Sequence, residues 1–350
     1  MLATMKNSFR QVKAGFRSSS PGFLNSFPFE HTDLYLGDVD HASDIMDPIE
    51  KLIQSKCFEE ASVEISNLEK RKTRFKNANY HFSGAAPMLH MPSGDLEDDP
   101  EAHIKALPDY KNWYKKRPDC PFAAGTLALA LGQTGYSFRG TDWAHKVSNE
   151  GWRQLEKYSS AASQIFQRHH EQFNGHWYWH RCLFDFSLIE GAEVSVQHKR
   201  FEDCVHLHPQ DFALYQNRAY QLLPRWYGSY EEVESLARYC VTNTKSEFGN
   251  IGYFKTYSNV LFSEEFESLL IDSNDLLSSS KAMYARAPEQ RYLTSLAASA
   301  IMADDVDLFR MIVKKHMTHF CETSWFAPND VYLTYALLDE FNEFNESKTN

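Results

Sequence analysis

Three stretches decide the fold, because each opens on a proline and continues in the same helical pattern: Pro209 precedes QDFALYQNRAYQLL (210–223), Pro288 precedes EQRYLTSLAASAIM (289–302), and Pro328 precedes NDVYLTYALLDEF (329–341). Apolar residues recur in them at three- and four-residue spacings, which predicts helices. The prolines lie 79 and 40 residues apart. Because half of 79 is close to 40, a further member is expected near residue 249. There Gly249 precedes NIGYFKTYSNVLF (250–262).

The chain therefore carries a degenerate period near 40 residues, in which a Tyr- and Ala-rich helix precedes a more polar one. The second helices are predicted at Tyr230–Thr244, Glu264–Tyr284 and Asp304–Met317. Stacked helix pairs at such a period form an α-solenoid. We expect an all-α, helical-repeat (tetratricopeptide-like α-solenoid) fold of stacked antiparallel helix pairs, in which small residues let neighbouring helices approach: Ala219, Ala298 and Ala300.

Composition excludes several classes of protein. Of 350 residues, 43% are hydrophobic and 14% aromatic, enough for a sizeable core. The formal net charge is −11, which argues against nucleic-acid binding and favours a basic partner. The longest strongly apolar stretch, Pro121–Leu131, is about half of the roughly 20 residues that a membrane span needs.

The six cysteines are scattered and form no CxxC pair, so reduced thiols are expected. The absence of an apolar leader at the start of the sequence favours a cytoplasmic protein.

The first 29 residues are basic, with no acidic residue before Glu30. We expect a flexible N-terminal segment over 1–45, although such a start is also typical of an organelle transit peptide or of a contact for an acidic partner. A helical domain over 46–262, further C-terminal repeats over 263–345 and a tail over 346–350 complete the predicted organisation.

Two further local patterns precede the helical repeats. Asp47-Pro48 is typical of a helix start, and a second helix is predicted from Phe58 to the basic residues near Arg71. His81–Pro108 is rich in proline and acidic residues and predicts a long solvated loop.

The run Leu223-Pro224-Arg225-Trp226-Tyr227-Gly228-Ser229 is a more specific signal. It follows a helix opened by His208-Pro209, and Gly249 lies about twenty residues later. The upstream landmarks are Trp113, Pro118, Ala123, the Arg139-Gly140 step and the Gly151-Trp152 step. Together these residues resemble the bacterial domain of unknown function 4034 family over roughly residues 48 to 262. The resemblance implies an all-α, tetratricopeptide-like fold, assigns no activity and brings no catalytic residues.

Histidines gather between His169 and His208. His176 and His180 are four residues apart, so on a helix both imidazoles share one face, as zinc ligands do. A third ligand would come from Cys182, His198 or Cys204. No glutamate follows His176, so a metalloprotease base is absent. The alternative is that these imidazoles hydrogen-bond locally on an aromatic-rich helix, with no cofactor.

Two clusters are candidates for partner binding: Arg139 with Trp143, and Arg225 with Trp226 and Tyr227. Arg139 would bind an anion or form an ion pair with Asp142 at the start of a helix. In the second cluster, Pro224 would end one helix and Gly228-Ser229 would cap the next. Trp226 would be either an exposed binding hot spot or a buried wedge between helix pairs.

No nucleophile elbow, phosphate loop, dinucleotide fingerprint or kinase signature is present, which lowers the odds of an enzyme. The expected function is that of a soluble helical-repeat protein mediating protein–protein interaction, for example a bacterial immunity or antitoxin-like binder of a basic partner. The alternatives are a metal-binding protein or enzyme that uses the His169–His208 region, and an architectural subunit of a larger assembly.

Overall fold

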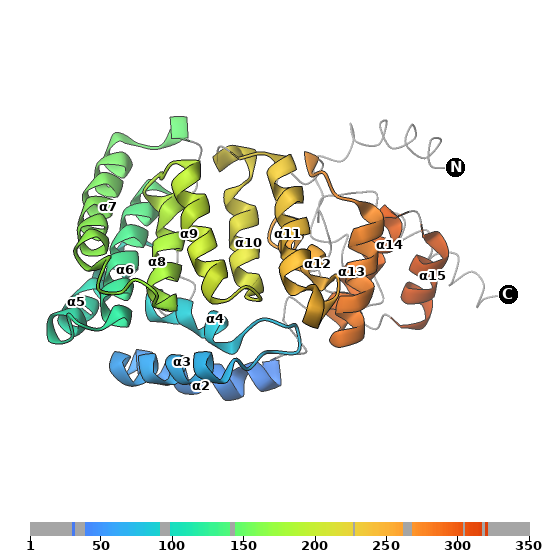
Figure 1. Cartoon of the computed structure of the whole chain (residues 1–350), viewed down its shortest axis with the longest axis horizontal. Coiled ribbons are helices and arrows are strands. Elements are labelled where there is room, and N and C mark those ends of the chain that lie inside the picture. Colours follow the sequence, from blue (N-terminus) through green and yellow to red (C-terminus); the bar gives the residue numbers. More distant parts are fainter. Residues whose placement is uncertain are drawn as a thin grey trace. The chain divides into compact units, whose positions relative to one another are not determined.

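The computed structural model describes residues 30–31, 39–91, 99–140, 144–226, 228–261, 268–303, 305–316 and 319–320. Within these residues the fold is all-α, with fourteen α-helices (Figure 1). The chain divides into two compact units. One unit is Asp40–Asn259, and the other consists of the described residues outside that range.

The first unit contains, in chain order, α2 (Val39–Gln54), α3 (Phe58–Arg71), α4 (His81–Ala85), the 3-10 turn η2 (Ala86–Leu89), α5 (Pro100–Lys116), α6 (Pro121–Arg139), η3 (Ala144–Lys146), α7 (Asn149–His169), α8 (Trp177–Ile189), α9 (Val194–Leu207), α10 (Phe212–Gln221), η4 (Pro224–Trp226), α11 (Tyr230–Phe248) and α12 (Ile251–Tyr257). The second contains α13 (Ser273–Arg286), α14 (Gln290–Met302) and α15 (Val306–Lys315). In the same unit, β1 (Glu30–His31) pairs in parallel with β2 (His319–Phe320).

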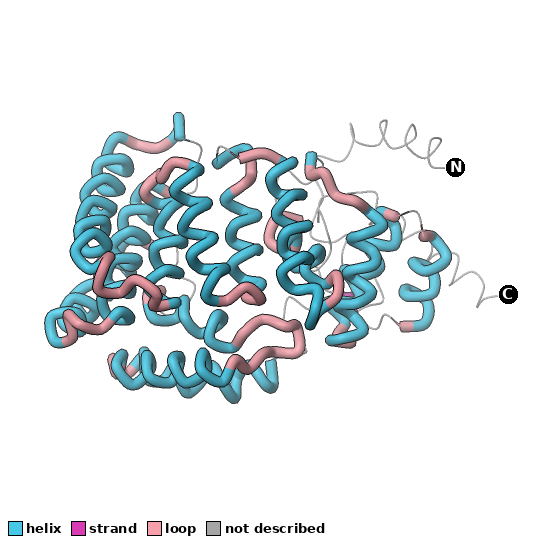
Figure 2. The backbone as a smooth tube through the Cα atoms, in the orientation of Figure 1, coloured by secondary structure: helices cyan, strands magenta, loops and turns pink. Residues whose placement is uncertain are grey.

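Helix α6 is the centre of the first unit and packs against α5, α7 and α8. Its small residues allow the close approach: a Cβ on Gly132 would lie 2.7 Å from the Phe186 ring of α8. From α8 onward, α9, α10 and α11 follow side by side (Figure 2). Tyr215 of α10 is fully buried and contacts the rings of Phe201 on α9 and Tyr239 on α11. Trp179 of α8 is fully buried against Phe166 of α7.

Each helix predicted from the proline-led period within the described residues corresponds to a helix of the structure, although some bounds differ. The first helices at 210–223, 250–262 and 289–302 correspond to α10, α12 and α14, and the second helices correspond to α11, α13 and α15. Helix α13 begins at Ser273, later than the predicted Glu264. The predicted helix at 329–341 and the predicted tail at 346–350 lie outside the described residues.

The predicted loop over His81–Pro108 is wrong for most of its described residues, while residues 92–98 lie outside the part that the structure describes. Helix α4 and η2 occupy its first part, and α5 begins at Pro100. The reason is that Asp99 accepts a hydrogen bond from the Glu101 N–H and caps α5, so Pro100 stands at a first-turn position where no N–H is needed. Pro108 lies inside α5.

The predicted helix start at Asp47-Pro48 is also wrong, because α2 begins at Val39 and contains Pro48. Residues 39–45 of the segment expected to be flexible are therefore helical, and Ile49 and Ile53 of the same helix are buried. The basic residues before Glu30 lie outside the described residues. Helix α3 ends at Arg71 as predicted.

No helix in the described part of the chain is long and apolar enough to cross a membrane. Four of the five described cysteines are buried, and all five are free thiols.

Candidate functional site

The connection between α10 and α11 is built as the sequence predicts. Pro224 opens the short turn η4, and the Trp226 N–H donates to the Leu223 carbonyl at 2.8 Å. A Cβ on Gly228 would lie 2.2 Å from the carbonyl oxygen of Leu222, so only glycine fits there. Ser229 caps α11, because its Oγ accepts from the Glu232 N–H at 3.2 Å. The turn thereby fixes the position of Trp226.

Aromatic rings from three segments of the chain surround Arg139. Its guanidinium carbon lies 5.6 Å from the ring centroid of Tyr136, 5.6 Å from that of Trp152 and 6.0 Å from that of Trp226. Arg139 Nη1 also donates to the Gly140 carbonyl at 2.7 Å. The end of α6, the start of α7 and η4 thus converge on one guanidinium group, at distances typical of cation–π contacts.

The cluster continues through η4. The guanidinium carbon of Arg225 lies 5.7 Å from the Tyr220 ring, and the Tyr220 and Trp226 rings are 6.1 Å apart. We name this group the arginine–aromatic cluster: Tyr136, Arg139, Trp152, Tyr220, Arg225 and Trp226. Trp152 is 41% exposed and the other five side chains are half-buried. Trp, Tyr and Arg are the side chains that most often carry the binding free energy of protein interfaces.

Sequence reasoning found only part of this cluster. Arg139, Arg225 and Trp226 were predicted partner-binding candidates, and the structure brings them together. Trp143 and Tyr227 lie outside the described residues, as does Asp142. The exposure of Trp152 was missed, and its Gly151-Trp152 step was the only signal for it.

The histidine region contains His176 and His180, the two residues predicted as zinc ligands. His176 is the N-cap residue of α8 rather than a residue of the helix, and burial lowers its pKa to about 4. His180 Nε2 accepts from the Gly175 N–H at 3.0 Å, so that nitrogen is engaged locally. Of the possible third ligands, Cys182 and Cys204 are buried and His198 is exposed on α9.

Among the described residues, no group of three or more His, Cys, Asp or Glu side chains is placed to hold a metal ion. Burial raises the pKa of the Cys182 and Cys204 thiols, which disfavours the thiolate that zinc binds. The zinc alternative stays a prediction that this geometry does not favour.

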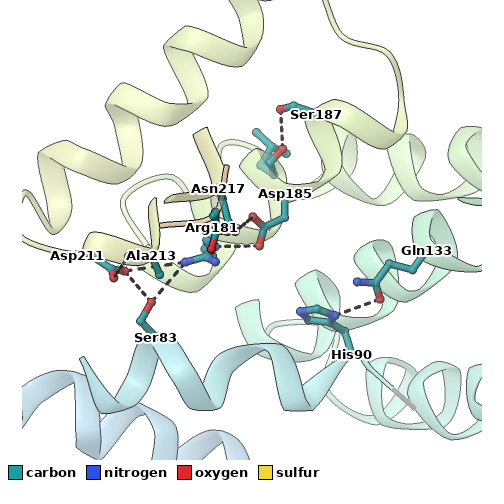
Figure 3. Close-up of polar contacts among 11 residues, drawn as sticks. Ser83, His90, Gln133, Arg181, Asp185, Ser187, Asp211, Ala213 and Asn217 are labelled. Atoms are coloured by element: carbon teal, nitrogen blue, oxygen red, sulfur yellow. Dashed lines mark hydrogen bonds and ion pairs between the residues drawn. The ribbon is translucent and has the colours of Figure 1, made fainter. Parts of the chain in front are cut away.

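A buried polar network joins α4, α8 and α10 (Figure 3). Arg181 Nε donates to Asp185 Oδ2 at 2.8 Å, and Arg181 Nη1 lies 3.9 Å from Asp211 Oδ2. Ser83 Oγ donates to the same Asp211 oxygen at 2.9 Å, and Asn217 donates to Asp185 at 3.3 Å. Each charged group has a partner inside the protein, so we assign the network to the stability of the fold.

A cavity of about 740 Å³ lies between α9, the end of α10 and α11. We name it the α9–α11 cavity. Its lining residues are Val194, Ser195, His198, Phe201, Glu202, Arg218, Leu222, Glu232, Ser235, Leu236 and Tyr239. Sequence reasoning missed it, because helical spacing does not tell which side chains leave space between neighbouring helices.

The described residues form an all-α protein, and the arginine–aromatic cluster is its candidate site for protein interaction. Residues 190–249 match the family model described as a domain of unknown function (DUF4034). The predicted resemblance is confirmed over these residues, which include the run Leu223–Ser229, Gly249 and every residue that lines the α9–α11 cavity. Its wider predicted range stays a prediction. No curated protein matches the chain, and neither does any solved structure.

Proposed function

We propose that this protein binds another protein through the arginine–aromatic cluster, on a tetratricopeptide-like solenoid of stacked antiparallel helix pairs. The helices that coincide with the 40-residue period support the repeat architecture. The cytoplasm is the proposed compartment, in keeping with the free thiols of the described cysteines.

One observation carries the proposal: side chains from α6, α7 and η4 meet around Arg139 and leave Trp152 41% exposed. Such a group gives a partner a large, rigid contact area, since aromatic side chains lose little conformational entropy on binding. Half-buried residues around an exposed tryptophan also exclude water from the contact.

The proposed partner has a basic surface. The chain carries 47 acidic and 36 basic residues, so its field attracts a basic protein at long range and repels nucleic acid. An immunity or antitoxin-like protein that covers a basic toxin surface is one specific form of this function. Arg139 and Arg225 act at short range, where they hold the aromatic rings in position.

Affinity purification from the native host tests the proposal. Wild-type protein is compared with the double variant Trp152→Ala/Trp226→Ala at low and at raised salt. We expect a partner enriched with the wild-type protein at low salt, enriched less at raised salt, and lost with the double variant.

Arg153→Ala is the matched control, because Arg153 is exposed on α7 beside Trp152 and pairs only with Glu150 of the same helix among the described residues. That variant should retain the partner. A partner bound equally by the double variant would place the interface elsewhere, and no enriched partner at either salt concentration would contradict the proposed function.

A further inference from the structure

Arg218 of α10 is 2% exposed, yet it lines the α9–α11 cavity. Its Nη1 donates to two amide oxygens, Gln197 Oε1 at 3.0 Å and Gln221 Oε1 at 3.3 Å. No carboxylate among the described residues forms an ion pair with it. The guanidinium is therefore held in place by neutral groups, while its positive charge lacks a close counter-charge.

The other buried arginines of the described chain do not share this feature. Arg181 pairs with Asp185 at 2.8 Å, and Arg291 pairs with Glu289 at 2.9 Å. Because a buried charge without a counter-ion is costly, Arg218 is the exception that needs an explanation. Burial lowers its pKa to about 10, and the charge of Glu232 offsets only part of that effect.

The cavity around Arg218 has the properties of a small-molecule site. Its volume of about 740 Å³ lies within the range of roughly 300–1,000 Å³ that ligand pockets occupy. Phe201, Leu222 and Leu236 are buried and supply apolar walls. A ligand here meets an apolar surface and one deeply buried cation.

Two carboxylates and one imidazole at the cavity limit the charge of the ligand. His198 and Glu232 are exposed at the cavity, and Glu202 is half-buried and accepts a hydrogen bond from the Tyr239 hydroxyl at 3.0 Å. The two carboxylates repel additional negative charge. A ligand with a single anionic group fits this arrangement better than a phosphate or a dicarboxylate.

We infer that the α9–α11 cavity binds a small monocarboxylic acid with an apolar body. Its carboxylate forms a charge-assisted hydrogen-bonded pair with Arg218, and its apolar body packs against Phe201, Leu222 and Leu236. This inference goes beyond the proposed partner binding and does not depend on it, because no residue of the arginine–aromatic cluster lines the cavity.

Saturation-transfer NMR and calorimetric titration of the full chain with hexanoate and with phenylacetate test the inference. We expect at least one acid to bind, and its neutral amide, hexanamide or phenylacetamide, to bind at least about tenfold more weakly. Equal affinity for the acid and its amide would overturn the inference. So would the absence of binding by both acids up to about 10 mM.

Three variants locate the site. Arg218→Gln should weaken binding of the acid at least about tenfold. Ser235→Trp should abolish binding by filling the cavity, and since Ser235 is exposed on α11, this variant does not depend on tolerance of a core change. Arg200→Gln is the control, because Arg200 lies on α9 outside the cavity lining and pairs with Glu190.

Circular dichroism verifies that each variant is folded. Unchanged affinity in folded Ser235→Trp, or in folded Arg218→Gln, would contradict the site. Equal loss in Arg200→Gln would show that binding depends on the stability of α9 and not on Arg218, which would also overturn the assignment.

Discussion

His90 illustrates how burial sets the behaviour of a single residue. It follows η2 and is buried, with its Nδ1 3.1 Å from Gln133 Oε1 on α6 (Figure 3). Burial lowers the pKa of His90 to about 4. The folded protein therefore holds this imidazole neutral at pH values where the unfolded chain protonates it.

The pH dependence of stability follows from this difference. Between the unfolded pKa of about 6.5 and the folded pKa of about 4, the unfolded state binds the extra proton, so the free energy of unfolding falls as the pH falls. From pH 7 to pH 5 the contribution of His90 is about 2 kcal/mol. Urea unfolding of wild-type protein and His90→Gln at both pH values measures it. The variant should lose less stability on acidification, and an identical loss would contradict a neutral buried His90.

At the scale of single residues, the sequence predicted roles that depend on local chain geometry. Pro224 and Ser229 act as expected, because a turn and a helix cap are set by neighbours in sequence. The paired role of His176 and His180 stays a prediction, and the structure places His176 at the N-cap before α8.

Among the glycines that the structure describes, Gly228 in the α10–α11 connection would bring an added Cβ nearest to another atom. A Cβ on Gly228 would overlap the Leu222 backbone at 2.2 Å, and a backbone neighbour cannot turn away as a flexible side chain can. Gly228→Ala should therefore lower the free energy of unfolding by about 1–3 kcal/mol or more. Thermal and urea unfolding measure the change.

Gly84→Ala is the control for that substitution, because a Cβ there would meet only the flexible ends of Met46 and Phe75, the nearest atom at 3.1 Å. It should change stability much less than Gly228→Ala. Equal effects of the two variants would mean that the contact with Leu222 is not the cause.

The buried polar network around Arg181 joins α4, α8 and α10. Arg181→Met would leave Asp185 and the almost fully buried Asp211 without their guanidinium partner. We expect a loss of about 3–5 kcal/mol in the free energy of unfolding, as for other broken buried ion pairs. Urea unfolding at neutral pH measures it. The exposed Arg153→Met variant should show little change, and a similarly small change in Arg181→Met would contradict the network's role.

Helices were predictable where apolar residues recur at helical spacing over a long stretch, as in α10, α11 and α14. The error at His81–Pro108 came from interpreting the prolines of that stretch as helix breakers, whereas Pro100 begins α5 and Pro108 is tolerated within it. Packing partners were not predictable: Arg181 and Asp185 share a helix turn, but nothing local indicates that Ser83 and Asp211 complete the network.

The whole molecule shows why the candidate site was only partly predictable. Arg139 and Trp226 belong to different segments of the chain. Only the packing of α6 and α7 beside η4 places the guanidinium carbon of Arg139 6.0 Å from the Trp226 ring centroid. The same is true of the α9–α11 cavity, whose lining comes from three helices. Composition predicted the sign of the charge and the presence of a core, while the location of a binding surface required the fold.

Site-specific photocrosslinking in the native host detects a partner that contacts the arginine–aromatic cluster. A photoreactive phenylalanine analogue replaces Trp152, which is 41% exposed, and, in a control, Val63 of α3, which is 50% exposed. We expect a discrete crosslinked partner, basic in composition, from position 152 and none from position 63. Crosslinking from position 63 alone, or no crosslink from position 152, would contradict it.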